Sequence, residues 1–278
     1  MNRNYKFISI SDIHLRTLKK HDAYKEMFEH MHIVLEKEKP DYFIINGDLF
    51  HQKITISNEA NELMGWFLDE STKFVKEKVI INVGNHDFVV GSNRVDTISP
   101  IVSLLNNDKI VYFKGSGCYK MENDNIVFCV WSLFDHDRPP KVKDYKETHD
   151  PLNQNLYIGL YHGIVKGCKT PTGITFDDEG VSLSDEDVYE VDHFNCGDIH
   201  LHEVKKYDNY KGKDKGLYVM NSSTLQQNHG EFLENHGWNK MFYDASTDEW
   251  EHDLFEVPNK YDYHTIILDG YDKLDLNN

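Results

Sequence analysis

The sequence predicts an α/β fold: a two-sheet β-sandwich flanked by helices. Up to about residue 107, runs rich in β-branched and aromatic residues alternate with helical patterns, at a spacing typical of βαβ units and a largely parallel sheet. After about residue 110 helical patterns become rare, and short strand-like runs follow one another between turn-rich loops. With 278 residues, 39% of them hydrophobic, the chain is long enough to bury the core of such a sandwich.

The first part of the chain alternates between strands and helices. Strands are expected at residues 5–11, 41–46 and 79–83, and helices at about 21–39, 57–76 and 97–107. The first helix is expected to end before Pro40, because the residue before a proline is disfavoured in helical conformation. The later strands, which we assign to the second sheet, are expected at residues 109–113, 118–121, 125–131, 155–161, 193–198, 216–221, 240–244 and 264–269.

The chain is expected to form one main domain over residues 1–260. Residues 261–278 are expected to be a tail or the start of a truncated capping element. Within the main domain, the polar, glycine-containing stretch "YDNYKGKDKG" (207–216) predicts an exposed hairpin turn.

The charge balance and the lack of long apolar runs restrict the function classes. The formal net charge of −17 argues against strong, unaided binding to duplex DNA, which is driven by neutralisation of phosphates. It is compatible with a nuclease that relies on metal ions and a partner. Because there is no apolar run of eighteen residues, no signal peptide and no CxxC pair, we expect a cytoplasmic protein with reduced thiols and no membrane contact.

Residues of the kinds that bind metals follow five of the predicted strands. "SDIH" follows the first strand, "NGDLFH" the second, "VGNHDF" the third, "YHG" the strand at 155–161 and "CGDIHLH" the strand at 193–198. Open α/β sheets place their ligand sites at the carboxyl ends of strands, so these loops are expected to converge on one edge. The candidate site residues are Asp12, His14, Asp48, His51, Asn85, His86, Asp87, His162, Asp198, His200 and His202.

The residue types point to metal-assisted phosphoester chemistry. Carboxylate, imidazole and amide-oxygen donors together suit Mn²⁺, Fe²⁺ or Zn²⁺ and exclude a structural thiolate site. A pair of such ions, which activates a water and stabilises charge on phosphoryl oxygens, needs a bridging ligand; Asp48 is the natural bridge because it follows a central strand. His86 is the candidate general acid for the leaving group, held by Asp87 beside it. Alternatively, His86 only supports another group by hydrogen bonding.

The stretch "CGDIHLHE" (196–203) leaves two ligand pairs open. Asp198, His200 and His202 occupy alternate positions, which project to the same side of an extended chain. The ligand pair is either Asp198 with His200 or His200 with His202. The preceding glycine and strand favour the first pair, which leaves His202 as an alternative or additional ligand.

The motifs DIH, GDLFH, GNHD, HG and GDIH, in that order and spacing, resemble those of the calcineurin-like metallophosphoesterases. Within that family, the histidine that ends "GDLFH" and the stretch "YHGIVKG" are similar to SbcD-type DNA repair nucleases. The stretch "NSSTLQQNHGE" (221–231) resembles their phage and viral members. The resemblance covers about residues 5–245 and implies the four-layer fold of the family, in the cytoplasm of a cell or of a viral host.

The resemblance also implies a role for each site residue. One metal would be bound by Asp12, His14, Asp48 and His200, and the other by Asp48, Asn85, His162 and Asp198. His86 would protonate the leaving group, and His51 would lie near the scissile phosphate. The family implies two divalent ions per chain, Mn²⁺ foremost, with Mg²⁺, Fe²⁺ or Zn²⁺ as alternatives. It also implies exonucleolytic and endonucleolytic cleavage of DNA in repair and recombination, a homodimer, and an SbcC-type ATPase partner.

Three features depart from the SbcD-type pattern. Gly197, Asp198, Ile199 and His200 stand where the family has G-H-x-H, only "YHTIILDGYDKLDLNN" follows the sandwich, and the charge balance is acidic. Two other functions therefore stay open. One is a phosphomonoesterase or nucleotide phosphodiesterase of the same superfamily, and the other is a non-catalytic scaffold that has lost the second metal through Asp198.

Overall fold

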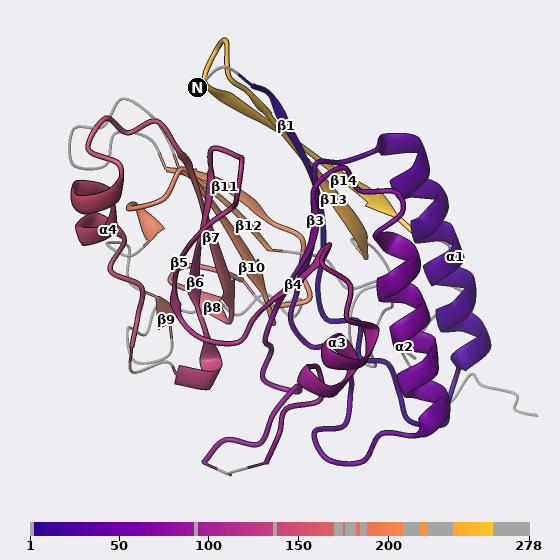
Figure 1. Ribbon diagram of the computed structural model, residues 1–278. Helices are drawn as coiled ribbons and strands as arrows, with labels where there is room; N and C mark the ends of the chain where they lie inside the picture. The colour runs from indigo at the N-terminus through magenta and orange to yellow at the C-terminus, as the bar shows by residue number, and fades with distance from the viewer. Residues whose placement is uncertain are drawn as a thin grey trace, which may run out of the picture.

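The structure, a computed structural model of the 278-residue chain, describes residues 3–91, 94–135, 138–169, 175, 182–183, 188–207, 217–221 and 236–257. Two six-stranded sheets stack against each other, and helices lie on their outer faces (Figure 1). The α/β sandwich with flanking helices that the sequence predicts is therefore confirmed.

The first sheet has the strand order β14-β13-β1-β2-β3-β4. Its parallel strands are β1 (Tyr5–Ile10), β2 (Tyr42–Asn46), β3 (Lys78–Asn82) and β4 (Ile110–Phe113). At one side β13 (Gly237–Asp244) pairs antiparallel with β1, and β14 (Glu249–Glu256) pairs antiparallel with β13. The carboxyl ends of the four parallel strands therefore share one edge of the sheet.

The second sheet also has four parallel strands, but with one antiparallel strand at each edge, in the order β11-β12-β10-β7-β6-β5. Its parallel strands are β6 (Ile126–Trp131), β7 (Leu156–His162), β10 (His193–Gly197) and β12 (Leu217–Asn221). The antiparallel edge strands are β5 (Gly117–Lys120) and β11 (Val204–Tyr207). A separate parallel pair is formed by β8 (Ile164–Val165) and β9 (Ser182–Leu183).

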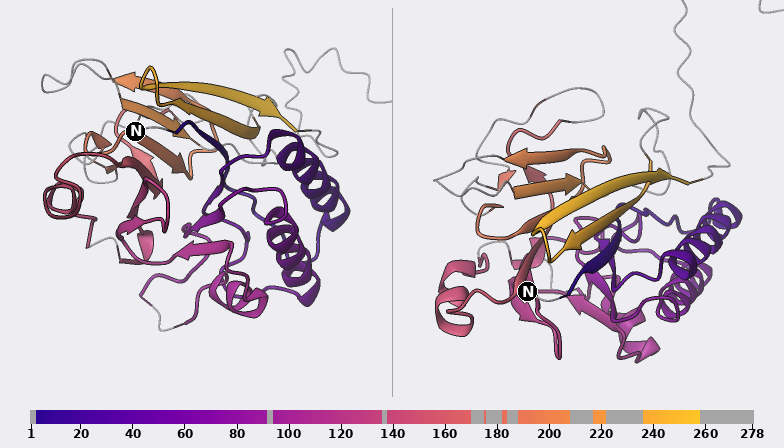
Figure 2. Two further views of the ribbon diagram at one scale, coloured as in Figure 1. Left: turned by 45° about the horizontal axis from the view of Figure 1, so that its top comes forward. Right: turned by 90° about the horizontal axis from the view of Figure 1, so that it is seen from above.

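Helices complete the four layers. The first sheet is covered by α1 (His21–Glu38), α2 (Asn58–Ser71) and α3 (Ser99–Leu105), and α4 (Val142–His149) lies against the second sheet (Figure 2). A short 3₁₀ helix, η1, covers Leu133–Asp135. Within the described part of the chain, none of these helices combines the length and the apolar character needed to cross a bilayer.

The alternation of side chains along β2 explains why the whole strand is buried. Phe43 and Ile45 point into the core between the first sheet and its helices. Tyr42 and Ile44 point the other way, into the core between the two sheets. A strand covered on both faces has a continuous run of apolar residues in its sequence, as "YFII" shows for β2.

The helix ends have local causes. Ser57 caps α2, because its Oγ accepts the Ala60 N–H at 3.1 Å. At the end of α1, Lys39 adopts a left-handed conformation and its N–H bonds to the Leu35 carbonyl, immediately before Pro40. The first helix therefore ends where the sequence predicts.

Three details of the predicted element order are corrected. The strands expected at 109–113 and 240–244 form β4 and β13, which join the first sheet and not the second. Helix α2 ends at Ser71, before the expected residue 76, because the N–H groups of residues 72–74 bond to carbonyls three residues back as the chain turns toward β3. The elements α4, β8, β9, β11, β14 and η1 are not among those expected from the sequence.

Three further expectations fall on residues outside the described part of the chain. The strand expected at 264–269 and the tail at 261–278 lie outside the described residues, as do residues 208–216 of the expected hairpin turn. The flanking strands β11 and β12 pair antiparallel, with Tyr207 opposite Leu217.

We predict that Ile44→Ala lowers the free energy of unfolding by about 2–5 kcal/mol, because it leaves a cavity between the sheets. Ile44 is 0% exposed in the inter-sheet core, whereas Ile33 on α1 is 64% exposed. The matched variant Ile33→Ala should change stability by no more than about 0.5 kcal/mol. Urea unfolding followed by circular dichroism measures both, and equal effects of the two variants would contradict the assigned packing.

Candidate metal centre

The loops after β1, β2, β3, β7 and β10 meet at one edge of the sandwich, where buried amides join the two sheets. The Asn46 side chain, at the end of β2, donates to the carbonyls of Tyr161 in β7 (3.0 Å) and Asn195 in β10 (2.9 Å). Asn82, at the end of β3, donates to the Asn46 side-chain oxygen at 2.8 Å. These bonds fix the strand ends of one sheet against those of the other.

Two groups of ligand atoms at this edge share the Asp12 carboxylate. In one group, His200 Nε2 lies 3.2 Å from His14 Nε2 and 3.1 Å from Asp12 Oδ1. In the other, His162 Nε2 lies 3.3 Å from Asp48 Oδ2 and 3.6 Å from Asp12 Oδ1. Asp48 Oδ2 is also 3.6 Å from His14 Nε2, so this carboxylate faces both groups. Within each group the donor atoms are close enough to hold one ion.

His162 shows most directly that the residues fit a metal ion. Its ring is fully buried, and Nδ1 lies 2.6 Å from the carbonyl oxygen of Asn46, which can only accept. One ring proton is therefore on Nδ1, so Nε2, which is directed at Asp48 and Asp12, can offer a lone pair to a metal ion once its own proton is removed. Nε2 has no hydrogen-bond partner among the described residues. A buried imidazole nitrogen that faces two carboxylates is a suitable ligand for a divalent cation.

The structure brings Asp198 and His200, not His202, to this site. The Asp198 N–H donates to Asp12 Oδ2 at 3.1 Å, and its Oδ1 accepts the Asn85 amide at 2.7 Å. Asp198 Oδ1 is 4.0 Å from His162 Nε2, so it lies at the rim of the second group. His202 joins none of the three ligand groups found in the described chain, and its charge acts instead on His252 of β14.

A third group consists of imidazoles. The rings of His51 and His86 are nearly parallel, with centroids 5.6 Å apart, and His14 meets each of them edge-on at 5.5 and 4.8 Å. His86 Nδ1 lies 2.7 Å from the His51 carbonyl oxygen, which orients the His86 ring. His14 therefore belongs both to a metal-binding group and to the imidazole group, so His51 and His86 lie directly beside the metal centre.

The expectation that Asp87 holds the His86 ring is corrected. The Asp87 carboxylate is fully buried and accepts three backbone N–H groups, from Asp48 (2.8 Å), Leu49 (3.0 Å) and Gly84 (2.9 Å). The contact that orients His86 comes from the His51 carbonyl. Neighbouring side chains here project in opposite directions, so Asp87 positions the loop that carries Asp48.

The site residues hold unusual backbone conformations. Asp12, His14, Asp48, Asp198 and His200 all have positive φ, between 49° and 78°. For a residue with a Cβ this region costs on the order of 1 kcal/mol, and such strain persists where surrounding contacts impose it. The contacts that impose these conformations include the hydrogen bond from the His14 N–H to the Asp48 carbonyl at 2.9 Å.

Two glycines are required for close approach to the site. Gly47 has a φ of +88°, and a Cβ there would lie 2.4 Å from His162 Nδ1. A Cβ at Gly84 would lie 2.2 Å from both the backbone nitrogen and Oδ1 of Asp48. The glycines in "NGD" and "VGN" are therefore needed for packing the ligand loops against each other, in addition to turning the chain.

The junction residues Asn46, Asn82 and Asn195 were not singled out from the sequence. Each is a polar residue within or at the end of an otherwise apolar strand, in "YFIIN", "KVIIN" and "HFNCG". A buried amide must be hydrogen-bonded. A polar residue in an apolar strand therefore indicates a hydrogen-bond partner elsewhere in the fold, and this pattern is the signal by which the three asparagines could be found in the sequence.

The charges at the site are strongly coupled. Burial opposes ionisation of Asp12, but His200 and His162 hold its pKa well below its usual range. Burial also opposes protonation of His162, but Asp48 and Asp12 raise its pKa well above the ordinary value. Burial lowers the pKa of His14 to about 4, and burial together with the charge of Asp48 raises the pKa of Asp87 to about 7. The carboxylates that attract a proton to His162 would attract a metal ion in the same way.

We predict that Asp198→Ala lowers the content of the second metal and that His202→Ala lowers it less. The Asp198 side chain accepts a hydrogen bond from Asn85, and the Asp198 backbone N–H donates to Asp12, whereas His202 faces β14. Metal content after dialysis, measured by inductively coupled plasma mass spectrometry, checks this. A greater loss in His202→Ala would show that His200 and His202 form the ligand pair.

We predict that the rise in Tm on loading with Mn²⁺, relative to EDTA-treated protein, increases from about pH 6 to about pH 8.5. The pKa of His162 is raised above its unfolded value of 6.5, so its proton stabilises the metal-free protein below that pH and is lost as pH rises. An ion at Nε2 needs that proton removed, so it binds better as pH rises. A difference in Tm that falls as pH rises would contradict the prediction.

Comparison with known proteins gives the family. A model of the calcineurin-like phosphoesterases matches residues 5–275. An uncharacterized protein, R555, of Acanthamoeba polyphaga mimivirus is 34% identical over 269 residues, which is 94% of this chain and 19% of that protein. The chain thus spans about one fifth of the length of this relative.

Solved structures also show similarity. Nuclease MPE of Pseudomonas putida is similar over 88% of this chain and 85% of its own, with 11% identity and a TM-score of 0.36. A dimetal phosphatase of Danio rerio is similar over 86% of this chain and 92% of its own, with 12% identity and a TM-score of 0.47.

The family match extends over nearly the whole described sandwich, and membership implies a metal-dependent hydrolase of phosphoesters. The candidate metal-binding groups at the strand ends agree with that chemistry. This chain belongs to the calcineurin-like phosphoesterase family.

Proposed function

We propose that this chain is a Mn²⁺-dependent nuclease that hydrolyses DNA phosphodiester bonds. The observation that carries the proposal is the His51 and His86 pair beside the metal centre, with the His86 ring fixed by the His51 carbonyl at 2.7 Å. Hydrolysis of a diester expels an alkoxide, which needs a proton in the transition state. An oriented imidazole outside the carboxylate groups is placed to provide one.

The tautomer of His86 suits a proton donor. When bound, the metal ions supply an activated water and stabilise charge on the phosphoryl oxygens. The His86 imidazolium donates the proton on Nε2, and the neutral ring that remains keeps its proton on Nδ1, where it donates to the His51 carbonyl. That carbonyl thus stabilises the protonated ring before transfer and keeps the ring oriented afterwards.

The remaining site residues take the roles that the resemblance implies. One ion would be held by Asp12, His14, Asp48 and His200, and the other by Asp48, Asn85, His162 and Asp198. Asn85 supplies its amide oxygen in this role while its amide nitrogen donates to Asp198. Oxygen and imidazole donors support Mn²⁺, with Mg²⁺, Fe²⁺ or Zn²⁺ as alternatives.

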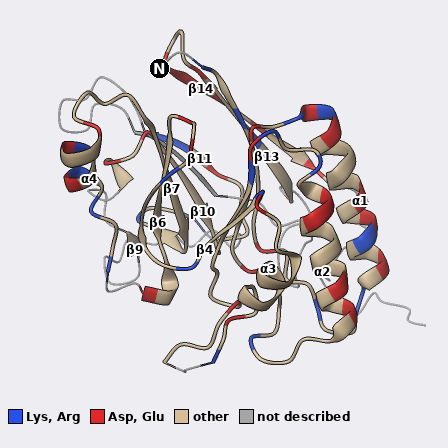
Figure 3. Cartoon of the chain, in the orientation of Figure 1, with Lys and Arg blue, Asp and Glu red and all other residues tan. Residues whose placement is uncertain are grey.

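The charge distribution supports dependence on metal ions and a partner. Acidic residues run along the outer helices α1 and α2, so this face would repel DNA (Figure 3). Approach at the strand-end edge is therefore favoured. We further propose that the chain acts as a homodimer, as the nuclease subunit of an SbcCD-like repair complex, with an SbcC-type ATPase supplying additional DNA contacts.

We predict that the protein cuts labelled single- or double-stranded DNA with Mn²⁺ and not with EDTA. His86→Ala should lower kcat by about 10²- to 10⁴-fold, the usual contribution of a general acid. His149→Ala, at an exposed histidine on α4, is the matched control and should retain activity. Mn²⁺ content of each variant separates loss of chemistry from loss of metal.

Other outcomes distinguish the competing functions. Hydrolysis of small phosphomonoesters or nucleotides without cleavage of DNA would favour a phosphatase or nucleotide phosphodiesterase. Metal content near one ion per chain, with no activity on any phosphoester, would favour a non-catalytic scaffold. Cleavage that survives both EDTA and His86→Ala would contradict the mechanism.

A further inference from the structure

Arg16 lies on a loop that runs beside the loop carrying His51. The segments 12–17 and 47–52 pair side by side, through bonds from the Leu15 N–H to the Leu49 carbonyl (2.9 Å) and from the His51 N–H to the Leu15 carbonyl (3.1 Å). Followed from the N-terminal to the C-terminal end, these paired segments begin near the carboxylates of Asp12 and Asp48. Arg16 comes beside His51, at the end farther from the carboxylates.

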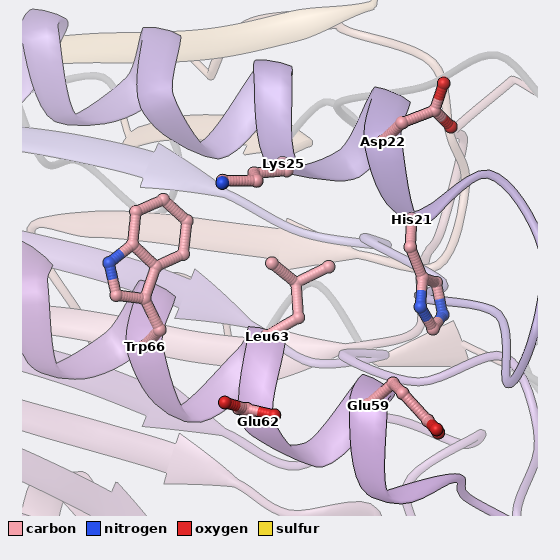
Figure 4. A pocket seen from close by; sticks show the side chains of 7 residues that line it. All are labelled: His21, Asp22, Lys25, Glu59, Glu62, Leu63 and Trp66. Carbon is pink, nitrogen blue, oxygen red and sulfur yellow. The ribbon is translucent and has the colours of Figure 1, made fainter.

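The backbone around Arg16 is held on both sides. His21 donates from Nε2 to the Arg16 carbonyl at 2.7 Å, because a carbonyl oxygen can only accept. The next residue, Thr17, is bonded through its N–H and Oγ1 to Gln52 Oε1, at 3.2 and 2.9 Å. The His21 ring also lines a cavity of about 460 Å³ between α1 and α2, together with Leu63 and Trp66 (Figure 4). The position of Arg16 is thus set by both helices and both loops.

The Arg16 side chain is partly exposed and has no carboxylate partner within the described part of the chain. Lys6, Lys76 and Lys114, by contrast, each pair with a carboxylate. Leu15 is fully buried, so Arg16 projects to the opposite, solvent side of the loop. Its positive charge acts on His51, where burial and then Arg16 lower the pKa of the imidazole.

Arg16 lies beyond the metal-binding residues along the paired segments. On its own loop it follows Asp12 and His14, and on the neighbouring loop it lies beside His51, which follows Asp48. A substrate that extends from the metal-binding groups past His51 therefore approaches Arg16.

We propose that Arg16 binds the DNA phosphate next to the scissile phosphate, on the His51 side of the site. This inference rests on the proposed nuclease function. A guanidinium is weakly hydrated and can form two parallel hydrogen bonds to a phosphate, which suits it to this position better than a lysine. Because the neighbouring metal-binding groups contain the Asp12 and Asp48 carboxylates, a cation without a carboxylate partner among the described residues gives the extended substrate a fixed register.

The test compares a polymer with a small diester. Arg16→Gln should lower kcat/KM for a labelled DNA oligonucleotide by about ten- to a hundredfold more than kcat/KM for bis(4-nitrophenyl) phosphate, both with Mn²⁺. Its log–log salt slope for DNA should be less steep by about 0.7–0.9, the value for one phosphate contact. Arg16→Lys should recover part of the loss, because it keeps the charge without the fork.

The matched control is Lys37→Gln, which removes one exposed positive charge in the last turn of α1. Lys37 lies about 24 Å along the helix from His21, at 1.5 Å per residue, so DNA cleavage should be unaffected. Equal proportional loss on both substrates in Arg16→Gln, or no loss on DNA, would overturn the role of Arg16. If the unmodified protein cleaves the small diester but no DNA, the proposed nuclease function itself fails.

Discussion

The Asn46 amide is the interaction on which the rest of the structure depends. It donates to one carbonyl in each of β7 and β10, and its own backbone carbonyl accepts from the His162 ring. Asn46, Asn195 and His162 are buried, so leaving any of their polar groups unpaired would carry the cost of desolvation. The relative register of the two sheets and the orientation of a metal-binding imidazole are therefore set by the same residue.

The metal centre opposes folding while the rest of the molecule favours it. Buried carboxylates at Asp12 and Asp48, and left-handed conformations at five site residues, are each unfavourable in isolation. They are held by three apolar cores, one between the sheets, one under the helices of the first sheet and one under α4, and by Asp87, which ties three backbone N–H groups of the loops together. Such conflicts between local preference and global fold are expected at functional sites, and here they coincide with the ligand residues.

The distribution of charge separates the chemistry of the site from the recognition of its substrate. Carboxylates dominate the metal centre and the outer helices, so a polyanion gains little from the chain as a whole. In the proposed nuclease, attraction comes from the bound ions, from Arg16 beyond His51 and from a partner. This arrangement makes cleavage depend on metal loading and on a small number of placed cations instead of a basic surface.

Much of the fold and of the site can be read from the sequence, because both follow from periodic burial and from the rule that ligand sites lie at strand ends. Alternating strands and helices up to residue 107 and the five polar strand-end loops predict one sandwich with one converging site. The pairing of Asp198 with His200 also follows from the glycine and strand before them. The junction asparagines stand out in the sequence as polar residues in apolar strands. Their hydrogen-bond partners cannot be identified from the sequence.

The sequence by itself determined which strands are buried, which loops carry the candidate ligand residues and which chemistry those residue types suit. Only the tertiary structure decided that β4 and β13 extend the first sheet, because an apolar run records burial and not the strand beside it. It also decided that Asp87 binds backbone N–H groups up to 39 residues away, that His202 turns toward β14, and that Arg16 stands beside His51. These contacts join segments distant in sequence, and no local pattern specifies which distant group a polar side chain will meet.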